Sequence, residues 1–401
     1  MSEQKKIVPK LRFPKFRGAE GWTQAVLVNA CNMQAGKFVA ASNISEQNPN
    51  GYVPCYGGNG LRGYTSTHTH NGTYPLIGRQ GALCGNVRLV SGKFHATEHA
   101  VVATPKTAIH VGWLYYALDL LNLNRFATGQ AQPGLSVDVL ENVFLAIPLQ
   151  EAEQQKIADC LSSLDELIAA QGRKVEALKT HKKGLMQQLF PREGETQPRL
   201  RFSEFQNTGD WLEQSVGDFG KVVTGSTPST AQPAFYGGGI PFASPADISD
   251  LRFVDQTKTT LTPEGFAETR PIRAGSVLFV CIGSTIGKVA QSMRDCATNQ
   301  QINAVVPNSK HSDGFVYFAL SLASERIAVL AGRQAVPIIN KSLFSSVRIR
   351  APKLAEQQRI ADCLSSLEDL ITSETKIFEV LKTHKNGLMQ QLFPSLKQIS
   401  L

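Results

Sequence analysis

Cysteine is scarce in this 401-residue chain and is poorly placed for bonding. The seven cysteines form no CxxC pair and are scattered over the sequence. An odd, dispersed set argues against a disulfide framework and against a structural zinc site. Cys160 and Cys363 occupy the same place in an internal repeat, on helices rich in apolar residues, and we expect both to be buried as small hydrophobic side chains.

Long apolar runs are also missing. No stretch approaches the roughly 20 residues that cross a bilayer, and the polar N-terminus has no apolar segment behind it. We therefore expect a cytoplasmic protein without a signal peptide. The length suggests two or three domains, and the net charge of +8 favours polyanionic partners such as nucleic acid.

One motif resembles a metal site, but its surroundings argue against that interpretation. His95-Ala96-Thr97-Glu98-His99 matches the HxxEH pattern, which chelates zinc when both histidines share a helix face. Phe94 and the β-branched run after His99 predict strand, turn and strand instead. We expect no metal here, although a metal hydrolase around His95 and His99 stays a rival hypothesis.

Other catalytic motifs are incomplete. Residues 283–289 resemble a Walker A loop but are one residue short, and Val289 stands where magnesium needs Ser or Thr. We find no Asn/Asp-Pro-Pro-aromatic loop, no glycine motif for S-adenosylmethionine and no carboxylate cluster of the nuclease type. We therefore expect no catalytic residue and no cofactor or metal site in this chain.

A long segment is written twice. Residues 153–191 and 356–394 are identical at 27 of 39 positions without a gap. A shorter pair precedes each block: Pro9-Lys10-Leu11-Arg12-Phe13 with Trp22, and Pro198-Arg199-Leu200-Arg201-Phe202 with Trp211. The order is therefore variable block, repeated segment, variable block, repeated segment.

Apolar residues in each repeat are spaced as in a heptad seam, which predicts one long helix that ends near Pro191 or Pro394. Gln171 and Lys182, with Glu374 and Lys385 in the second copy, interrupt the seam. The apolar seam positions are Ile157, Leu161, Leu164, Ile168, Val175, Leu178, Leu185 and Leu189, and Ile360, Leu364, Leu367, Ile371, Phe378, Leu381, Leu388 and Leu392.

A single seam must be buried, and the two copies can bury it against each other as an antiparallel pair. Helices that pack separately on their own domains are the alternative. Polar residues away from the seam are also repeated, so we expect both polar faces to meet the same kind of partner. The candidate docking residues are Lys179, His181, Lys182, Gln187, Gln188, Lys382, His384, Lys385, Gln390 and Gln391.

The variable blocks, roughly 10–150 and 198–352, combine short β-branched runs with glycine turns. We predict strands at 74–78, 86–90, 100–103, 277–281, 288–290 and 303–306, and helices near 111–123 and 313–330. The predicted fold class is α+β: two mixed α/β domains separated by two long helices that form an antiparallel coiled coil. The expected segments are 1–150, 151–191, 192–352 and 353–401.

Glycine-rich polar loops recur in both variable blocks. Arg, Gln, Asn, Ser and Thr match the donors and acceptors of base edges, and glycine lets the backbone approach phosphates. The candidate DNA-binding residues are Asn59, Arg62, Tyr64, Arg79, Gln80, Gln130 and Gln132 in the first block, and Ser226, Thr227, Ser284, Thr285, Lys288, Asn299, Gln300, Arg333 and Gln334 in the second.

This arrangement resembles the specificity subunit of Type I restriction-modification systems over nearly the whole chain. The resemblance rests on Glu-Gln-Gln-x-Ile-Ala after Pro148 and Pro352, and on Gly-Leu-Met-Gln-Gln-Leu-Phe-Pro at 184–191 and 387–394. It also includes Gly78-Arg79-Gln80-Gly81, and Thr285-Ile286-Gly287-Lys288 with Asn299-Gln300-Gln301.

The resemblance implies that each variable block is a target recognition domain for one half of a bipartite DNA site. It implies a coiled coil that sets the spacer and docks two modification subunits, which bind S-adenosylmethionine and methylate adenine N6. Restriction subunits would bring ATP, magnesium and cleavage. Residues 225–228 have no clear counterpart in block one, so we expect an asymmetric target. A DNA-binding scaffold or regulator without methyltransferase partners is the alternative.

Overall fold

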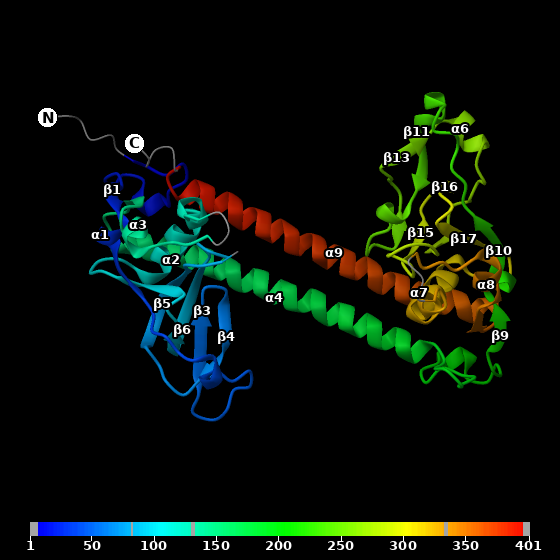
Figure 1. Ribbon diagram of the computed structural model, residues 1–401, viewed down its shortest axis with the longest axis horizontal. Coiled ribbons are helices and arrows are strands. Elements are labelled where there is room, and N and C mark those ends of the chain that lie inside the picture. The colour runs from blue at the N-terminus through cyan, green and yellow to red at the C-terminus, as the bar shows by residue number, and fades with distance from the viewer. Residues whose placement is uncertain (1–6, 82, 130–132, 333–335, 396–401) are drawn as a thin grey trace. The chain divides into compact units, whose positions relative to one another are not determined.

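The chain folds into two compact units. The computed structural model describes residues 7–81, 83–129, 133–332 and 336–395. Unit 1 comprises residues 1–173 and 376–401, and unit 2 comprises residues 174–375. Each unit therefore contains the first half of one long helix and the last half of the other (Figure 1). Within the described residues, no helix is both long and apolar enough to span a membrane.

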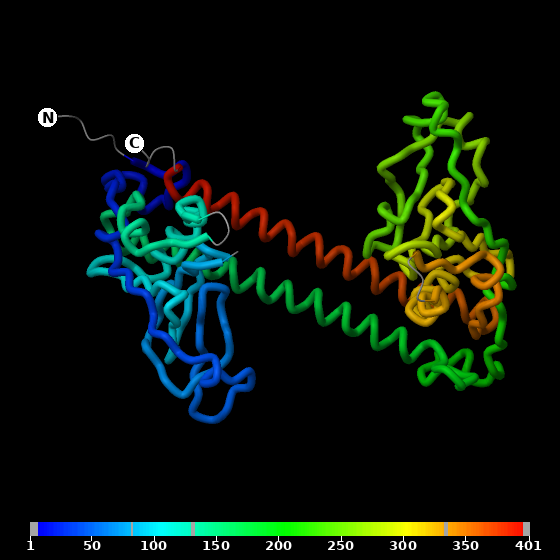
Figure 2. The backbone as a smooth tube through the Cα atoms, in the orientation of Figure 1, coloured from blue at the N-terminus to red at the C-terminus, as the bar shows by residue number. Residues whose placement is uncertain are grey.

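The two repeats form two long helices, as predicted. Helix α4 (Glu151–Leu189) and helix α9 (Leu354–Leu392) have 39 residues each, and Figure 2 shows both as unbroken coils. Each helix ends two residues before a proline, Pro191 or Pro394, because the residue before proline is pushed out of the helical region. The predicted helix ends are thus confirmed to within two residues.

The predicted seam is the covered side of both helices. Its apolar positions are buried at Leu161 and Leu364 (both 0% exposed) and at Val175 in the middle of α4, and the other positions in the middle of the helices are half-buried. The four polar seam residues are covered as well: Glu374 is buried and Gln171, Lys182 and Lys385 are half-buried. A heptad pattern of this kind is what an antiparallel coiled coil requires.

Contacts within each unit show that the helices are antiparallel. In unit 1, Lys385 Nζ lies 2.5 Å from Asp165 Oδ1. In unit 2, Lys174 Nζ lies 2.7 Å from Glu374 Oε1, and the ammonium of Lys182 pairs with Glu368. Residue numbers rise along α4 as they fall along α9, so the first half of each helix pairs with the last half of the other.

In unit 1 a buried ion pair fastens the N-terminal segment to the start of α4. Arg12 donates from Nε and Nη2 to the two carboxylate oxygens of Glu153, at 2.7 Å each, and Trp22 Nε1 donates to Glu153 Oε1 at 3.3 Å. The next residue, Gln154, accepts from His110 N at 2.8 Å. The Trp22 ring also packs edge-on against Phe393, which follows α9.

Unit 2 repeats this anchor with the roles of the helices exchanged. Arg201 donates from Nε and Nη2 to Glu356 at 2.8 Å, and Trp211 Nε1 donates to Glu356 Oε1 at 3.2 Å. The Trp211 ring packs edge-on against Phe190, which follows α4. The repeated Arg and Trp therefore have the same role in both units. They connect the start of one long helix, through its Glu, to the Phe that follows the end of the other long helix.

Unit 1 has a six-stranded sheet in the order β2-β7-β5-β6-β3-β4, with the separate pair β1-β8. Buried Trp113 and Leu114 of helix α2 belong to a core with Ile77 and Val101 of the sheet. The strands are β1 (Thr23–Val26), β2 (Cys31–Ala35), β3 (Val53–Gly57), β4 (Gly60–Thr65), β5 (His70–Gly78), β6 (Val87–Ala96), β7 (Ala100–Pro105) and β8 (Phe144–Ile147). The other α-helices are α1 (Leu27–Ala30), α2 (Val111–Leu120) and α3 (Val137–Glu141).

Unit 2 has a five-stranded sheet in the order β10-β17-β14-β15-β12, a three-stranded sheet β13-β11-β16, and the pair β18-β9. Its strands are β9 (Leu212–Ser215), β10 (Gly220–Thr224), β11 (Tyr236–Ala243), β12 (Phe253–Val254), β13 (Thr259–Leu261), β14 (Val277–Val280), β15 (Val289–Ser292), β16 (Ala297–Thr298), β17 (Ile302–Pro307) and β18 (Arg348–Ala351). Its shorter α-helices are α5 (Val216–Phe219), α6 (Pro263–Ala267), α7 (Asp313–Val329) and α8 (Lys341–Ser346).

The predicted strands and helices of both blocks are confirmed, including strand, turn and strand at 94–103. The prediction for Cys160 and Cys363 is only partly right, because both thiols are half-buried rather than buried. The other five cysteines are buried, and burial raises the pKa of Cys31 to about 12 and that of Cys281 to about 11. Buried neutral thiols of this kind are poor nucleophiles.

Candidate functional site

The turns that follow the central strands β5 and β14 have the same backbone hydrogen bonds. The donor and acceptor of each bond in unit 1 have equivalents in unit 2. By these bonds, residue 79 of unit 1 corresponds to residue 281 of unit 2, and residue 81 to residue 283. The equivalent bonds, from N to O, are Gly78 to Asn86 and Val280 to Lys288, Arg79 to His99 and Cys281 to Gln301, Gly81 to Pro133 and Gly283 to Pro337, Gly85 to Gly78 and Gly287 to Val280, and Leu135 to Arg79 and Ile339 to Cys281.

A second set of bonds equates the loops after β2 and β10. Gly36 N donates to Ala100 O at 2.9 Å, and Gly225 N donates to Ile302 O at 3.1 Å. A Cβ at either glycine would lie 2.1 Å from a backbone oxygen, so only glycine fits. Gly36 is thus the backbone counterpart of Gly225. The further equivalent bonds are Lys37 to Ala96 and Ser226 to Thr298, Thr97 to Tyr56 and Asn299 to Ala243, and Ala100 to Thr97 and Ile302 to Asn299.

These bonds gather the loops of each unit at one edge of its main sheet. We call residues 36–38, 57–59, 79–81 and 97–99 loop cluster 1, and residues 225–227, 281–285 and 299–301 loop cluster 2. The loops of cluster 1 touch closely, because a Cβ at Gly58 would lie 3.0 Å from His99 O and 3.1 Å from Gln80 O. In cluster 2, Thr227 Oγ1 donates to Gln300 Oε1 at 2.7 Å.

Four predicted DNA-binding residues of unit 1 meet at loop cluster 1. Asn59 and Gln80 are exposed there, and the Cδ of Arg62 covers Gly57 so closely that a Cβ at Gly57 would lie 2.7 Å from it. Arg79 is half-buried, and its Nε is buried without a hydrogen-bond partner among the described residues. The guanidinium therefore lies partly inside loop cluster 1, with an Nε that is covered by the protein.

Loop cluster 2 contains six of the predicted DNA-binding residues of unit 2: Ser226, Thr227, Ser284, Thr285, Asn299 and Gln300. Thr227 and Gln300 are exposed and joined by their side chains, while half-buried Asn299 donates from Nδ2 to Gln301 Oε1 at 3.0 Å. Ser226 is half-buried, and its Oγ has no hydrogen-bond partner in the described part of the chain. The adjoining turn carries exposed Ser284 and half-buried Thr285.

Some predicted residues lie elsewhere. Tyr64 sits on β4 away from the turn, opposite Pro54, and its backbone pairs with Ser45. The exposed side chain of Lys288 reaches back to Ile248, whose carbonyl oxygen accepts from Nζ at 3.1 Å. Four predicted residues lie outside the described residues: Gln130, Gln132, Arg333 and Gln334.

Sequence reasoning missed several residues of loop cluster 1 and its rim. Lys37 and Phe38 are exposed, and the Phe38 side chain is 75% exposed. His99 Nε2 lies 3.2 Å from Glu98 Oε1, and a Cβ at Gly60 would lie 3.1 Å from Arg88 Nη2. The sequence marks this loop by one feature, a glycine that directly follows the first strand of each main sheet: Gly36 after β2 and Gly225 after β10.

A family model described as the Type I restriction modification DNA specificity domain matches residues 20–180 and 208–383, which is most of the chain. The chain belongs to this specificity family. Each match includes one loop cluster, begins just before Trp22 or Trp211 of the short repeats, and ends within one of the long repeats. The resemblance that the motifs predicted is therefore confirmed.

Relatives in the specificity family are similar over parts of the chain. The EcoprrI specificity subunit of Escherichia coli is 46% identical over 136 residues, which cover 34% of each chain. The MjaIX specificity subunit of Methanocaldococcus jannaschii is 30% identical over 179 residues, which cover 43% of this chain and 41% of that one. The chain thus spans less than half the length of either relative.

Solved structures of the specificity family share the fold. The S subunit of a type I restriction-modification system from M. genitalium has a TM-score of 0.70 at 16% identity, covering 97% of this chain and 100% of that one. A second structure, from work on complex assembly of the type I system, has a TM-score of 0.55 at 15% identity, covering 96% and 100%. Two mixed α/β domains with long helices are therefore the fold of this family.

Most of the predicted docking residues on the two long helices are exposed in both copies of the repeat. Lys179 and Lys382 each pair with a glutamate one turn earlier, at 2.8 Å and 3.1 Å. Lys182 and Lys385 are instead half-buried in the seam ion pairs. The remaining predicted docking residues are exposed: His181, Gln187, Gln188, His384, Gln390 and Gln391.

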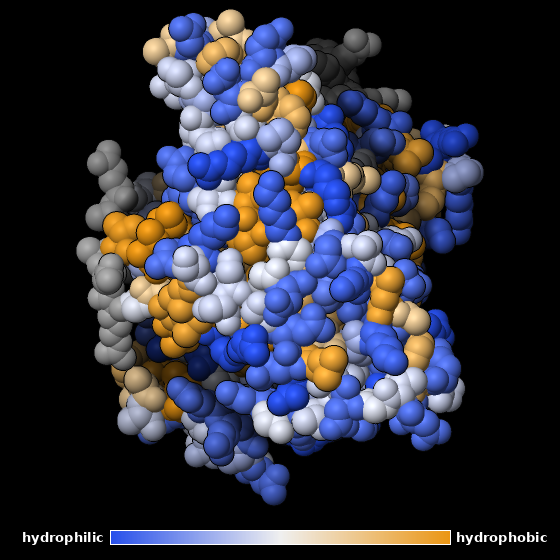
Figure 3. All heavy atoms as spheres, turned by 90° about the vertical axis from the view of Figure 1, so that its right-hand side faces the viewer, coloured by the Kyte–Doolittle hydropathy of each residue, from blue (hydrophilic) through white to orange (hydrophobic). Residues whose placement is uncertain are grey.

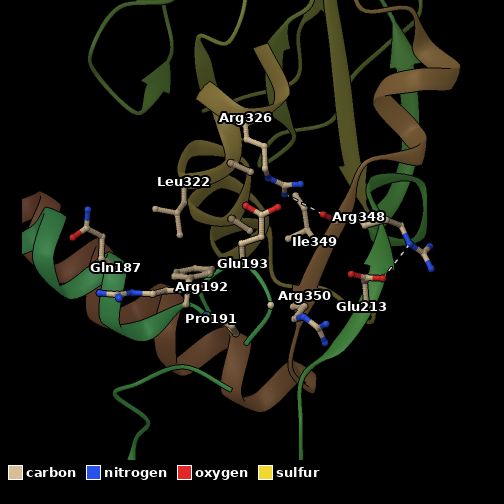
Figure 4. A pocket seen from close by; sticks show the side chains of 14 residues that line it. Gln187, Pro191, Arg192, Glu193, Glu213, Leu322, Arg326, Arg348, Ile349 and Arg350 are labelled. Carbon is tan, nitrogen blue, oxygen red and sulfur yellow. Dashed lines mark hydrogen bonds and ion pairs between the residues drawn. The ribbon is translucent and has the colours of Figure 1, made fainter. Parts of the chain in front are cut away.

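Unit 2 also has a cleft of about 640 Å³ at the end of α4 (Figure 4). Gln187 lines it, and so do Arg348 and Arg350 of β18. Leu322 on its wall is 42% exposed, and Figure 3 shows apolar side chains gathered among hydrophilic ones on one face of the molecule. The strand pair β1-β8 of unit 1 is the counterpart of β9-β18 in unit 2. In this comparison Phe144 corresponds to Arg348 and Ala146 to Arg350, so the cleft is not part of the repeated frame.

The HxxEH residues have other partners in the structure. His95 is buried, with Nε2 3.0 Å from Lys37 O and Nδ1 3.0 Å from Thr67 Oγ1. Because a carbonyl can only accept, Nε2 donates to Lys37 O, and both ring nitrogens have protein partners. Among the described residues, no three His, Cys, Asp or Glu side chains are grouped so that they could hold a metal ion.

Proposed function

We propose that this chain is the DNA-reading subunit of a Type I restriction-modification complex. The observation that carries the proposal is the shared backbone frame that holds a loop cluster in each unit. The frame is the same, whereas the side chains on it differ. A constant frame with variable side chains is what recognition of different base sequences by one kind of domain requires.

Each loop cluster would contact one half of a bipartite target. Half-buried Arg79, and exposed Asn59 and Gln80, are the side-chain types that match purine edges in the major groove. Thr227 and Gln300 present a different hydrogen-bond pattern in unit 2. We therefore propose an asymmetric target with two unlike half-sites.

The long helices would set the spacer and dock the partners. Lys179 and His181 are exposed on α4, and the same two residue types are exposed at the equivalent positions 382 and 384 on α9. Core packing does not require them. We propose two modification subunits that dock there, bind S-adenosylmethionine and methylate adenine N6. The adenine must be flipped out of the duplex for this reaction, so the present chain has only to position the DNA. Restriction subunits with ATP and magnesium would complete a cytoplasmic complex.

Methylation mapping tests this proposal. The chain would be expressed with its modification partners in a host that lacks other adenine methylation, and the methylated sites would be sequenced. We expect two unlike half-sites separated by a constant gap. A continuous site, a palindrome or a gap of variable length would contradict the proposal.

Assembly separates this proposal from a scaffold or regulator that acts alone. Size-exclusion chromatography with light scattering of the full chain and a candidate modification subunit should give two modification subunits per chain. Absence of any association, together with retained DNA binding, would favour the regulator.

A further inference from the structure

Phe38 is an aromatic residue that loop cluster 1 presents to the surroundings. Its side chain is 75% exposed and lies between the exposed Lys37 and the half-buried Val39. Single exposed apolar residues are common on protein surfaces and need no explanation by themselves. The case for a role rests on how the backbone holds this residue and on what surrounds it.

The backbone directly before Phe38 is fixed on both sides. Lys37 N donates to Ala96 O at 2.8 Å, and Lys37 O accepts from His95 Nε2 at 3.0 Å. His95 is itself buried and held by Thr67. The fold thus uses a buried histidine to order the loop at the point where the exposed ring begins. A loop backbone ordered in this way loses little conformational entropy on binding.

Loop cluster 1 and its rim carry several basic side chains and one acidic side chain, that of Glu98. Lys37 is the neighbour of Phe38 in the chain, and Arg62, Arg79 and Arg88 lie around the adjoining turn of β3 and β4. Cationic side chains around an exposed aromatic ring suit duplex DNA, since the cations contact phosphates and the ring contacts the faces of bases. Phenylalanine is also among the side chains that wedge between base pairs.

Unit 2 has a different residue at this position. The shared hydrogen bonds of Gly36 and Gly225 make Thr227 the counterpart of Phe38. Thr227 Oγ1 is hydrogen-bonded to Gln300, so this position in unit 2 offers a polar group.

We propose that Phe38 is an apolar wedge that packs against a partly unstacked base step in the half-site contacted by unit 1, and that unit 2 has no equivalent wedge. This inference rests on the proposed DNA-reading function. It predicts that the first half-site contains a step that deforms easily, such as a pyrimidine–purine step, at a position without a hydrogen-bonded base contact.

The test uses the full chain in complex with its modification subunits and the DNA target found by methylation mapping. A 2-aminopurine base is placed in turn at each position of both half-sites. With the wild type, 2-aminopurine at an adenine flipped for methylation should brighten in either half-site, and we expect one further rise in fluorescence at another step of the first half-site. Phe38→Ala should abolish that rise and weaken binding by about 10-fold or more, while Phe38→Trp should retain both. The second half-site should be unaffected.

Two matched controls sharpen the result. Phe144→Ala removes another exposed phenylalanine of unit 1 (42% exposed), on β8 rather than in the loop cluster, and should leave both readouts unchanged. Lys37→Ala should reduce the salt dependence of binding by about one counterion, whereas Phe38→Ala should leave the salt slope unaltered.

Two outcomes would overturn the wedge. Sequence-specific binding that survives Phe38→Ala at full strength, with unchanged fluorescence, would refute it while leaving the proposed function intact. A loss of modification-subunit binding in the absence of DNA would make Phe38 a protein contact instead. If the wild type lacked sequence-specific binding altogether, the proposed function itself would be wrong.

Discussion

Units 1 and 2 differ in most side chains of their main sheets and loops, yet they share the same backbone frame. The order β2-β7-β5-β6 in unit 1 is matched by β10-β17-β14-β15 in unit 2. The anchors are matched as well, since Arg12 and Glu153 correspond to Arg201 and Glu356. Buried ion pairs, tryptophans and glycines therefore hold the backbone frame in both units, while the exposed loop residues are free to differ.

The largest expected effect comes from the anchors. Glu153→Ala would leave the Arg12 guanidinium and the Trp22 indole N–H buried without their acceptor, at a cost of about 3–5 kcal/mol. Glu356→Ala should do the same to unit 2. Hydrogen exchange resolved by segment should show the loss of protection in the mutated unit first. Glu204→Ala, which breaks the exposed pair with Arg359, is the control and should leave the stability of both units nearly unchanged. Equal loss in both units would argue against separate anchors.

Changes in the loop clusters should affect one half-site each. Arg79→Ala is expected to weaken binding of the first half-site by about 1–3 kcal/mol, because it removes the guanidinium proposed to contact a base edge. Gln300→Ala should weaken only the second, through loss of the partner of Thr227. Binding would be measured by fluorescence anisotropy on targets with one half-site scrambled at a time. If Arg79→Ala weakened both half-sites equally, the assignment of loop cluster 1 would be wrong.

The two seam lysines permit a finer comparison. Removal of Lys182 leaves Glu368 with Arg252, whose Nη1 lies 3.1 Å from it. Removal of Lys385 leaves Asp165, among the residues that the structure describes, with the hydroxyl of Tyr116 as its side-chain donor from another part of the chain. Lys385→Ala should therefore destabilise unit 1 more than Lys182→Ala destabilises unit 2. Double-mutant cycles with Asp165→Ala and Glu368→Ala should give couplings of about 0.5–3 kcal/mol, with the larger value for Lys385 and Asp165. Base preference should be unchanged in every variant, and a shift in methylated sequence would contradict the division between frame and loops.

The sequence predicted the long helices well because their determinants are local. A heptad seam from Ile157 to Leu189 and a proline at 191 define the helix without knowledge of the rest of the fold. The short strands were predicted for the same reason, by β-branched runs between glycines. The repeat of Arg12 and Trp22 at Arg201 and Trp211 was visible, but its reason was not, because their partner Glu153 lies more than a hundred residues away.

The loop clusters could be predicted only in part. Polar residues beside glycine, such as Asn59 and Gln80, were predicted to bind DNA; the structure places both in loop cluster 1, and their contact with DNA stays a prediction. Lys37 and Phe38 could not be found, since their equivalence to Ser226 and Thr227 exists in backbone hydrogen bonds and not in side-chain identity. Non-local β pairing of this kind leaves little trace in one sequence beyond the required glycine.

The smallest effect on stability, and the most informative about partners, is expected at the helix surfaces. Lys179→Ala and Lys382→Ala each break an exposed pair within one helix, so each should change the free energy of unfolding by less than about 1 kcal/mol. Neither residue is needed for packing, yet both copies keep it. Titration of the full chain with modification subunits, followed by mass photometry, should therefore show weaker occupancy for each single variant and the weakest for the double variant. Unchanged occupancy in the double variant would move the docking surface away from these lysines, and the unmatched cleft lined by Arg348 and Arg350 would become the next surface to test.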